Sequence, residues 1–115
     1  MTPFDSFVAQ LKALGYAIDE RHRDRGIAVI LDFCVRTGRH AGKVIAVGLH
    51  GADFPMTPPA GIHINPPLAA NGQNNVSESP LGNGWQYWSR RLTSWSTDRS
   101  AHHIISYINK VFHDA

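Results

Sequence analysis

The sequence predicts an α+β domain in which two helices pack on one face of an antiparallel sheet. Three observations lead to this prediction. Apolar residues recur at helical spacing near both ends of the chain, alternating apolar residues mark strands between them, and the links between those strands are short. With 115 residues, of which 43% are hydrophobic, we expect a single domain over residues 1–115 whose core needs neither a metal nor a disulfide.

The first helix is predicted over residues 3–14. Thr2 can cap its N-terminus, Pro3 suits the first helical position, and Asp5 places negative charge in the first turn. Gly15 then predicts a left-handed cap at the C-terminal end. The apolar stripe that must lie against the core is made of Phe4, Phe7, Val8, Leu11 and Leu14.

Four strands are predicted next, at residues 16–18, 27–36, 44–49 and 61–65. The clearest is the second, in which one set of alternating residues is expected to share a face and Cys34 to lie on the other. That set is Ile27, Val29, Leu31, Phe33 and Val35. Because consecutive strands joined by short links pair as hairpins, the sheet is expected to be an antiparallel meander.

A stiff elbow, Phe54-Pro55-Met56-Thr57-Pro58-Pro59, precedes the fourth predicted strand. Each proline fixes its own φ and pushes the residue before it towards extended geometry, so this segment aims the strand that follows it.

Residues 66–84 are crowded with Pro, Gly, Asn and Ser, and no regular element is predicted there. In a small domain, a segment of this length without regular structure is usually either functional or mobile. The next eleven residues carry Trp85, Trp88 and Trp95. Such an aromatic cluster either forms a partner-binding surface or anchors the segment to the core, and anchoring is the commoner use.

The second helix is predicted to follow a capping region at Ser96-Thr97-Asp98 and to end near His113. Its apolar residues are Ile104, Ile105, Tyr107, Ile108, Val111 and Phe112.

Charge and composition exclude several classes of function. The formal net charge is +2 and the longest basic run, residues 21–25, is interrupted by Asp24, so we expect no nucleic-acid partner. No apolar run is long enough to span a membrane and no signal-peptide pattern opens the chain. The single cysteine fits a reducing compartment, and a cytoplasmic location is expected.

Cofactor and metal chemistry is not indicated either. The adjacent His102 and His103 point to different helix faces, and no spacing typical of zinc ligands occurs, so no metal site is expected. The sequence has no Gly-x-Ser-x-Gly elbow and no phosphate-binding glycine loop, and no cofactor is expected.

The order of these elements resembles the ubiquitin-conjugating enzymes and their relatives. Residues 54–59 match that family's Tyr-Pro-x-x-Pro-Pro motif with Phe in place of Tyr, and Trp95-Ser96 followed by a helix matches the Trp-Ser/Thr-Pro stretch after the active site. With one helix after the tryptophan, the chain is most similar to compact bacterial members. That resemblance implies the ubiquitin-conjugating fold, a ubiquitin-activating-like enzyme and a ubiquitin-like protein as partners, and a setting in antiphage defence.

The chain departs from the family at the catalytic residue. Active relatives carry a nucleophilic cysteine shortly before the tryptophan, whereas residues 66–95 contain none. Counting forward from Pro59 places Ser79 near the missing position and Asn71 near the family's oxyanion-stabilising asparagine, while counting back from Trp95 lands near residues 87–89 and favours Ser89.

A serine nucleophile would form an oxyester and would need a base, for which His63, His102 and His103 are available. The ordinary role of serine in such a segment is turn and capping chemistry. Arg90 and Arg91 are expected either to be solvated or to lie beside the site and attract an acidic tail or an oxyanion. Arg90 is grouped with the three tryptophans as a partner-binding residue.

Three hypotheses follow. The chain is a divergent conjugating protein that acts through a serine oxyester, a non-catalytic binding module of the same pathway, or an interaction domain unrelated to conjugation. The resemblance places the pathway first and leaves catalysis and scaffolding equal within it.

Overall fold

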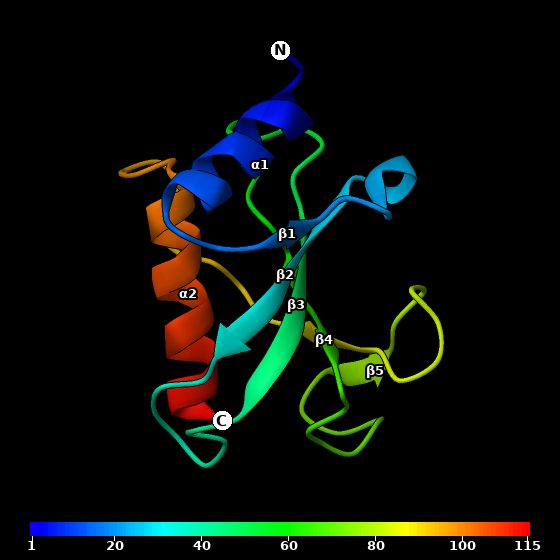
Figure 1. The fold of residues 1–115 in the computed structure, drawn as a ribbon. Helices are drawn as coiled ribbons and strands as arrows, with labels where there is room; N and C mark the ends of the chain where they lie inside the picture. The colour runs from blue at the N-terminus through cyan, green and yellow to red at the C-terminus, as the bar shows by residue number, and fades with distance from the viewer.

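The computed structural model describes residues 1–115, which form one six-stranded sheet with two helices beside it (Figure 1). The elements in chain order are α1 (Pro3–Ala13), β1 (Ile18–Asp19), the 3₁₀ turn η1 (Arg23–Arg25), β2 (Ile27–Cys34), β3 (Val44–His50), β4 (Gly61–Asn65), β5 (Val76–Glu78), β6 (Gln86–Ser89) and α2 (Ala101–Asp114). The strand order is β1-β2-β3-β4-β6-β5, and every neighbouring pair is antiparallel. The predicted α+β class is confirmed.

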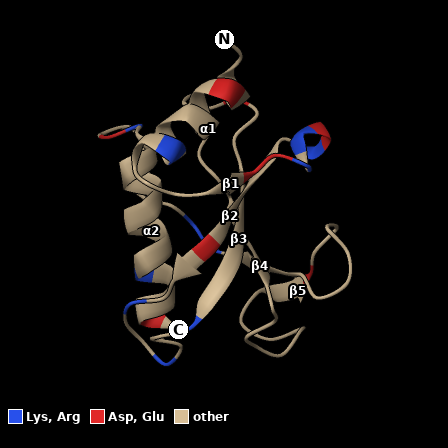
Figure 2. Cartoon of the chain, viewed as in Figure 1, with Lys and Arg blue, Asp and Glu red and all other residues tan.

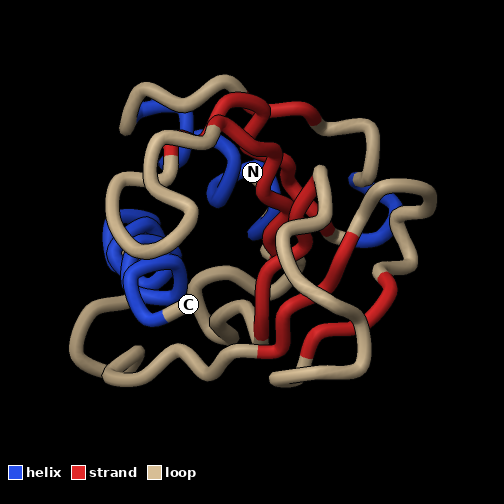
Figure 3. The backbone as a smooth tube through the Cα atoms, turned by 90° about the horizontal axis from the view of Figure 1, so that it is seen from below, coloured by secondary structure: helices blue, strands red, loops and turns tan.

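Both helices cover the same face of the sheet, while the turn after β5 covers part of its other side (Figures 1 and 3). We call these the helix face and the outer face. The main core lies between the helices and the helix face, and its fully buried members include Phe7, Leu11, Val47, Leu49, Ile62, Ile64, Ile104 and Ile108. The amphipathic patterns that predict the two helices therefore identify the core correctly.

The predicted count of four strands is wrong, because two further strands form in the part of the chain expected to be irregular or purely aromatic. β5 interrupts the Asn- and Ser-rich segment, where Val76 is buried and pairs with Trp88 of β6. β6 in turn pairs with β4, so that Ile62 lies opposite Trp88. Strands this short carry too few alternating residues to give a periodic signal, and their partners stabilise them instead.

The second strand departs from its predicted pattern. Its register shifts between Ile30 and Phe33, so a bulge divides it. Because side chains alternate along a strand, the extra residue exchanges the two faces: Ala28 and Ile30 join the helix-face core, while Ile27 and Val29 are buried on the outer face. The prediction that Ile27, Val29 and Phe33 share one face is therefore wrong.

The helix ends follow their predicted chemistry, with one shift. The Thr2 hydroxyl accepts a hydrogen bond from the Asp5 N–H at 3.1 Å, and Gly15 has φ 99°, as a left-handed cap requires. α2, however, is capped by Ser100, which accepts from the His103 N–H at 3.2 Å. The predicted cap at residues 96–98 is therefore two to four residues too early.

The proline elbow meets the last tryptophan directly. Trp95 Nε1 donates a hydrogen bond to the Pro55 carbonyl oxygen at 2.9 Å, and its ring lies 6.1 Å from that of Phe54. Phe54 is buried and also packs on Phe7, with ring centroids 5.0 Å apart. Two landmarks separated by forty residues in the sequence are thus adjacent in the fold.

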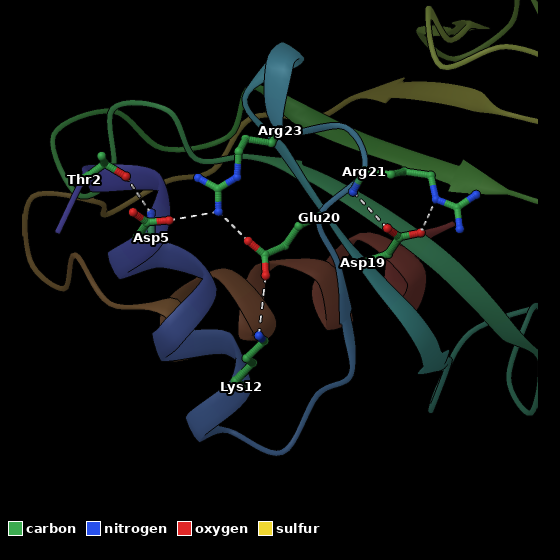
Figure 4. A network of polar contacts seen from close by, with 7 residues as sticks. All are labelled: Thr2, Asp5, Lys12, Asp19, Glu20, Arg21 and Arg23. Carbon is green, nitrogen blue, oxygen red and sulfur yellow. Dashed lines mark hydrogen bonds and ion pairs between the residues drawn. The ribbon is translucent and has the colours of Figure 1, made fainter.

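Charged side chains join α1 to the segment before β2 (Figure 4). Arg23 pairs with both Asp5, at 2.9 Å, and Glu20, while Lys12 reaches Glu20 at 3.5 Å. The hydrogen bond from Arg23 lowers the pKa of the Asp5 carboxyl. These side chains are well exposed, so the network orients the segment more than it stabilises the fold. Neither helix is long and apolar enough to cross a membrane.

Candidate functional site

The densest group of polar side chains lies on the outer face of the sheet. Alternation along the strands places Gly48 and His50 of β3, His63 of β4 and Tyr87 of β6 on this face. Gly48 has no side chain, and this lets His63 on the neighbouring strand lie close to the β3 backbone, because a Cβ at Gly48 would lie 3.2 Å from the His63 Cβ. It would also lie 3.5 Å from Leu81, which shows that the turn after β5 covers this part of the sheet.

Within this group, Ser79, His63 and His50 form a continuous hydrogen-bonded row, which we call the His63 relay. Ser79 Oγ lies 2.8 Å from His63 Nδ1, and His63 Nε2 lies 3.1 Å from His50 Nε2. Ser79 and His63 are 8% and 2% exposed, whereas His50 is exposed to solvent. Tyr87 completes the group, since its ring centroid lies 4.7 Å from that of His63.

One arrangement of protons satisfies all the hydrogen bonds within the relay. The Leu81 N–H donates to Ser79 Oγ at 3.1 Å, and in this arrangement the Ser79 hydroxyl donates to His63 Nδ1. His63 then carries its proton on Nε2 and donates it to His50. This assignment requires a neutral His63.

The surroundings keep His63 neutral. Burial lowers the pKa of His63 to about 4, and the nearby His50 and His22 act in the same direction. Burial also lowers the pKa of His50 and raises the pKa of the Tyr87 hydroxyl. At neutral pH the cluster is therefore uncharged.

The relay contains the pairing expected of a serine nucleophile and its base, but the serine is not presented to a substrate. A histidine within 2.8 Å of a serine hydroxyl satisfies the distance for general-base activation. The hydroxyl is nevertheless buried, and its turn is closed by backbone bonds from Gly82 to Ser79 and from Ser79 to Trp85. Ser79 acts here as a turn residue that fastens the 79–85 segment onto the sheet.

The other two predicted catalytic residues lie elsewhere. Asn71 accepts a hydrogen bond from the buried Gln86 Nε2 at 2.9 Å, on the helix face of β6. Ser89 is exposed at the end of β6, and its side chain makes no hydrogen bond. Asn71, Ser89 and the Ser79–His63 pair thus lie in three separate places, and of the four candidate residues only Ser79 and His63 are in contact.

His102 and His103, the other two bases considered for a serine, belong to α2, and His102 is exposed. His103 Nδ1 lies 2.6 Å from the Asp98 carbonyl oxygen, and the His103 ring packs 5.7 Å from the Trp95 ring. Because α2 covers the helix face, the sheet separates His103 from Ser79.

The tryptophans divide between core and surface. Trp88 is 2% exposed and Trp95 is 8% exposed, so the anchoring interpretation describes both, and their predicted place on a partner-binding surface does not match their burial. Trp85 is half-buried beside His22, with ring centroids 6.4 Å apart. Arg90 is partly exposed and lies over the Trp88 ring at 5.3 Å.

Sequence reasoning missed two polar residues that organise this region. Gln86 accepts from Leu68 N, Ala69 N and Trp88 Nε1, and so ties the start of the long connection to β6. His50 ends the relay at the solvent. A signal for His50 was present, because the antiparallel pairing of residues 44–49 with 61–65 brings histidines at the end of one strand and the middle of the next onto one face.

The described residues contain no group of three or more His, Cys, Asp or Glu side chains placed to hold a metal ion. Cys34 lies on the face opposite Phe33, as predicted, and it is exposed. Comparison with family models, with curated proteins and with solved structures finds no match to this chain.

Proposed function

We propose that this chain is a ubiquitin-conjugating-like module that binds components of a conjugation pathway without forming a covalent intermediate itself. The observation that carries the proposal is the contact between the elbow and the indole: Trp95 Nε1 donates to the Pro55 carbonyl at 2.9 Å beside an antiparallel sheet. The two motifs that carry the resemblance lie forty residues apart in the sequence, and their adjacency supports treating them as parts of one arrangement.

The non-catalytic form of the proposal rests on the candidate nucleophiles. The segment at residues 66–95 has no cysteine, Ser79 is buried and already hydrogen-bonded, and Ser89 is exposed but has no base beside it. An unassisted hydroxyl is a weak nucleophile at neutral pH. The partners of the proposed module are a ubiquitin-like protein and a ubiquitin-activating-like enzyme, in the bacterial cytoplasm.

A catalytic form of the same module is the second candidate, and one observation favours it. The 2.8 Å separation of Ser79 Oγ and His63 Nδ1 is the geometry of a serine and its general base. Opening of the 79–85 turn would be required before the hydroxyl could attack the activated C-terminus of a ubiquitin-like protein.

The two forms separate in a charging assay. The chain is mixed with ATP and with a ubiquitin-like protein and an activating enzyme encoded beside it, and the products are analysed by mass spectrometry with and without alkali. The proposal expects measurable binding in a pull-down but no adduct. An alkali-labile adduct that is lost in Ser79→Ala or Ser89→Ala and retained in Ser77→Ala would establish the catalytic form. Absence of both binding and adduct would remove the link to conjugation.

A further inference from the structure

A cleft of about 550 Å³ lies on the helix side of the molecule, between the segment that leaves β6 and one side of α2. Its walls are residues 90–93 and a stripe of α2 that includes His103, Tyr107 and Lys110. These three residues are spaced three or four positions apart along α2 and therefore lie on one face of the helix. The volume lies within the range of sites that hold small molecules or short peptide segments. We call this the basic cleft.

Cations dominate the charge of the basic cleft. Arg90, Arg91 and Lys110 line it, against a single acidic side chain, that of Asp114. Asp114 is paired with Lys110 at 3.0 Å, on the exposed side of α2. Figure 2 shows the blue of the segment after β6 beside the helix. Arg91 is exposed and makes no hydrogen bond or ion pair within the chain.

The protein holds Arg90 in place before any ligand arrives. Its Nη1 donates to the Asn74 carbonyl at 2.7 Å and to the Ser89 carbonyl at 2.9 Å, and its guanidinium lies over the Trp88 ring. The Arg90 carbonyl accepts from the Tyr107 hydroxyl at 2.8 Å, which fixes the segment to α2. Its Nη2 and Nε remain without a partner in the chain. A pre-oriented guanidinium loses little entropy when it binds a carboxylate.

The floor of the basic cleft is apolar. Leu92, Tyr107 and Val111 present the small part of their surface that is not buried in the core. An apolar floor below cations favours a ligand that carries both a carboxylate and an aliphatic group. Short acidic peptides have this composition, and clusters of arginine recognise them in other proteins. Nucleic acid fits less well, because the cleft has no exposed aromatic platform on which a base could stack.

We propose that the basic cleft is a binding site for an acidic peptide segment, with Arg90 and Arg91 contacting its carboxylates and Leu92 and Val111 contacting an aliphatic side chain. This site goes beyond the proposed function, because it is defined by its own lining and involves neither the elbow nor the His63 relay. It predicts binding by an isolated peptide in the absence of any ubiquitin-like protein.

Fluorescence anisotropy tests the proposal with a fluorescein-labelled octapeptide of alternating Glu and Leu, and with its Gln and Leu counterpart. The acidic probe is expected to bind and the neutral probe to bind at least tenfold more weakly. Because the change removes a charge-assisted hydrogen bond and adds a like-charge repulsion, Arg91→Glu should weaken acidic-probe binding at least tenfold. Lys110→Glu, on the opposite wall, provides a second variant and should also weaken binding.

Arg25→Glu is the matched control, because it makes the same charge change in η1, which lies across the sheet from α2 (Figure 1). It should bind the acidic probe as the unmodified chain does, and circular dichroism should show all three variants folded. Equal binding of both probes, or Arg91→Glu binding as well as Arg25→Glu, would overturn the proposal. So would tighter binding of a single-stranded RNA octamer that displaces the acidic probe.

Discussion

The His63 relay and the basic cleft lie on opposite faces of the same sheet and treat their polar groups in opposite ways. In the relay, Ser79 and His63 are buried and bonded to each other, so the cluster is closed. In the basic cleft, Arg91 faces open volume and has no partner. Residue types alone would favour the relay as the functional site, because serine and histidine carry catalytic chemistry.

The difference teaches that accessibility, more than residue type, separates a structural polar cluster from a binding site. A buried polar group that lacks a partner costs free energy, so the protein satisfies it internally and thereby gains a fixed turn. An exposed cation pays no such cost and is available to an outside ligand. Substitutions in the relay should therefore change stability, and those in the basic cleft should change binding.

Loss of stability in acid is the largest effect that we expect, and it would show that the His63 relay is closed to protons. The pKa of His63 is about 4 in the folded chain and 6.5 as the unperturbed value, so the unfolded state binds more protons between these pH values. The free energy of unfolding should fall as pH decreases from 6.5 to 4, by about 3 kcal/mol from His63 alone. Urea denaturation at a series of pH values measures it.

His63→Gln should flatten that pH profile without abolishing it. His40 and His50 contribute with the same sign, because burial also lowers the pKa of each of them. His102→Gln is the control, since this histidine is exposed on α2 and makes no side-chain hydrogen bond. A profile as steep in His63→Gln as in His102→Gln would show that the relay is not closed to protons.

Removal of the Ser79 hydroxyl should have the next largest effect. Ser79→Ala leaves His63 Nδ1 and the Leu81 N–H without their partner inside a buried turn, which should destabilise the chain by about 2 kcal/mol. Ser77→Ala is the matched control, because Ser77 is exposed on β5 and makes no side-chain hydrogen bond; it should change stability by less than about 0.5 kcal/mol. Equal thermal midpoints for both variants would indicate that Ser79 does not fasten the turn.

Sequence reasoning predicted the parts of the fold that depend on local periodicity. The Phe4 to Leu11 stripe, the Gly15 cap and the three longer strands follow from residues close together in the chain. β5 and the bulge in β2 could not be predicted in this way. The short β5 depends on Trp88 twelve residues later, and the bulge depends on how β3 pairs with both halves of β2.

The candidate site shows the same division. The sequence predicts Ser79 as a candidate nucleophile and His63 as a candidate base. Their 2.8 Å separation, however, depends on the register of β4 and on the path of the 79–85 turn. Their burial depends on that turn covering the sheet. The sequence predicts no cleft beside Arg91. The cleft forms because Tyr107 and Lys110 of α2 lie across from Arg91, and the start of that helix at Ser100 is itself later than the sequence predicts.

The smallest expected effect is a contrast between two adjacent arginines. Arg90→Ala removes two hydrogen bonds to carbonyl groups and a contact with the Trp88 ring, and should lower the free energy of unfolding by about 1 kcal/mol. Arg91→Ala removes no contact within the chain and should change it by less than about 0.5 kcal/mol. Paired urea titrations at pH 7 measure both. A larger loss in Arg91→Ala than in Arg90→Ala would mean that Arg91 stabilises the fold, and the basic cleft would then lose the feature that distinguishes it from the His63 relay.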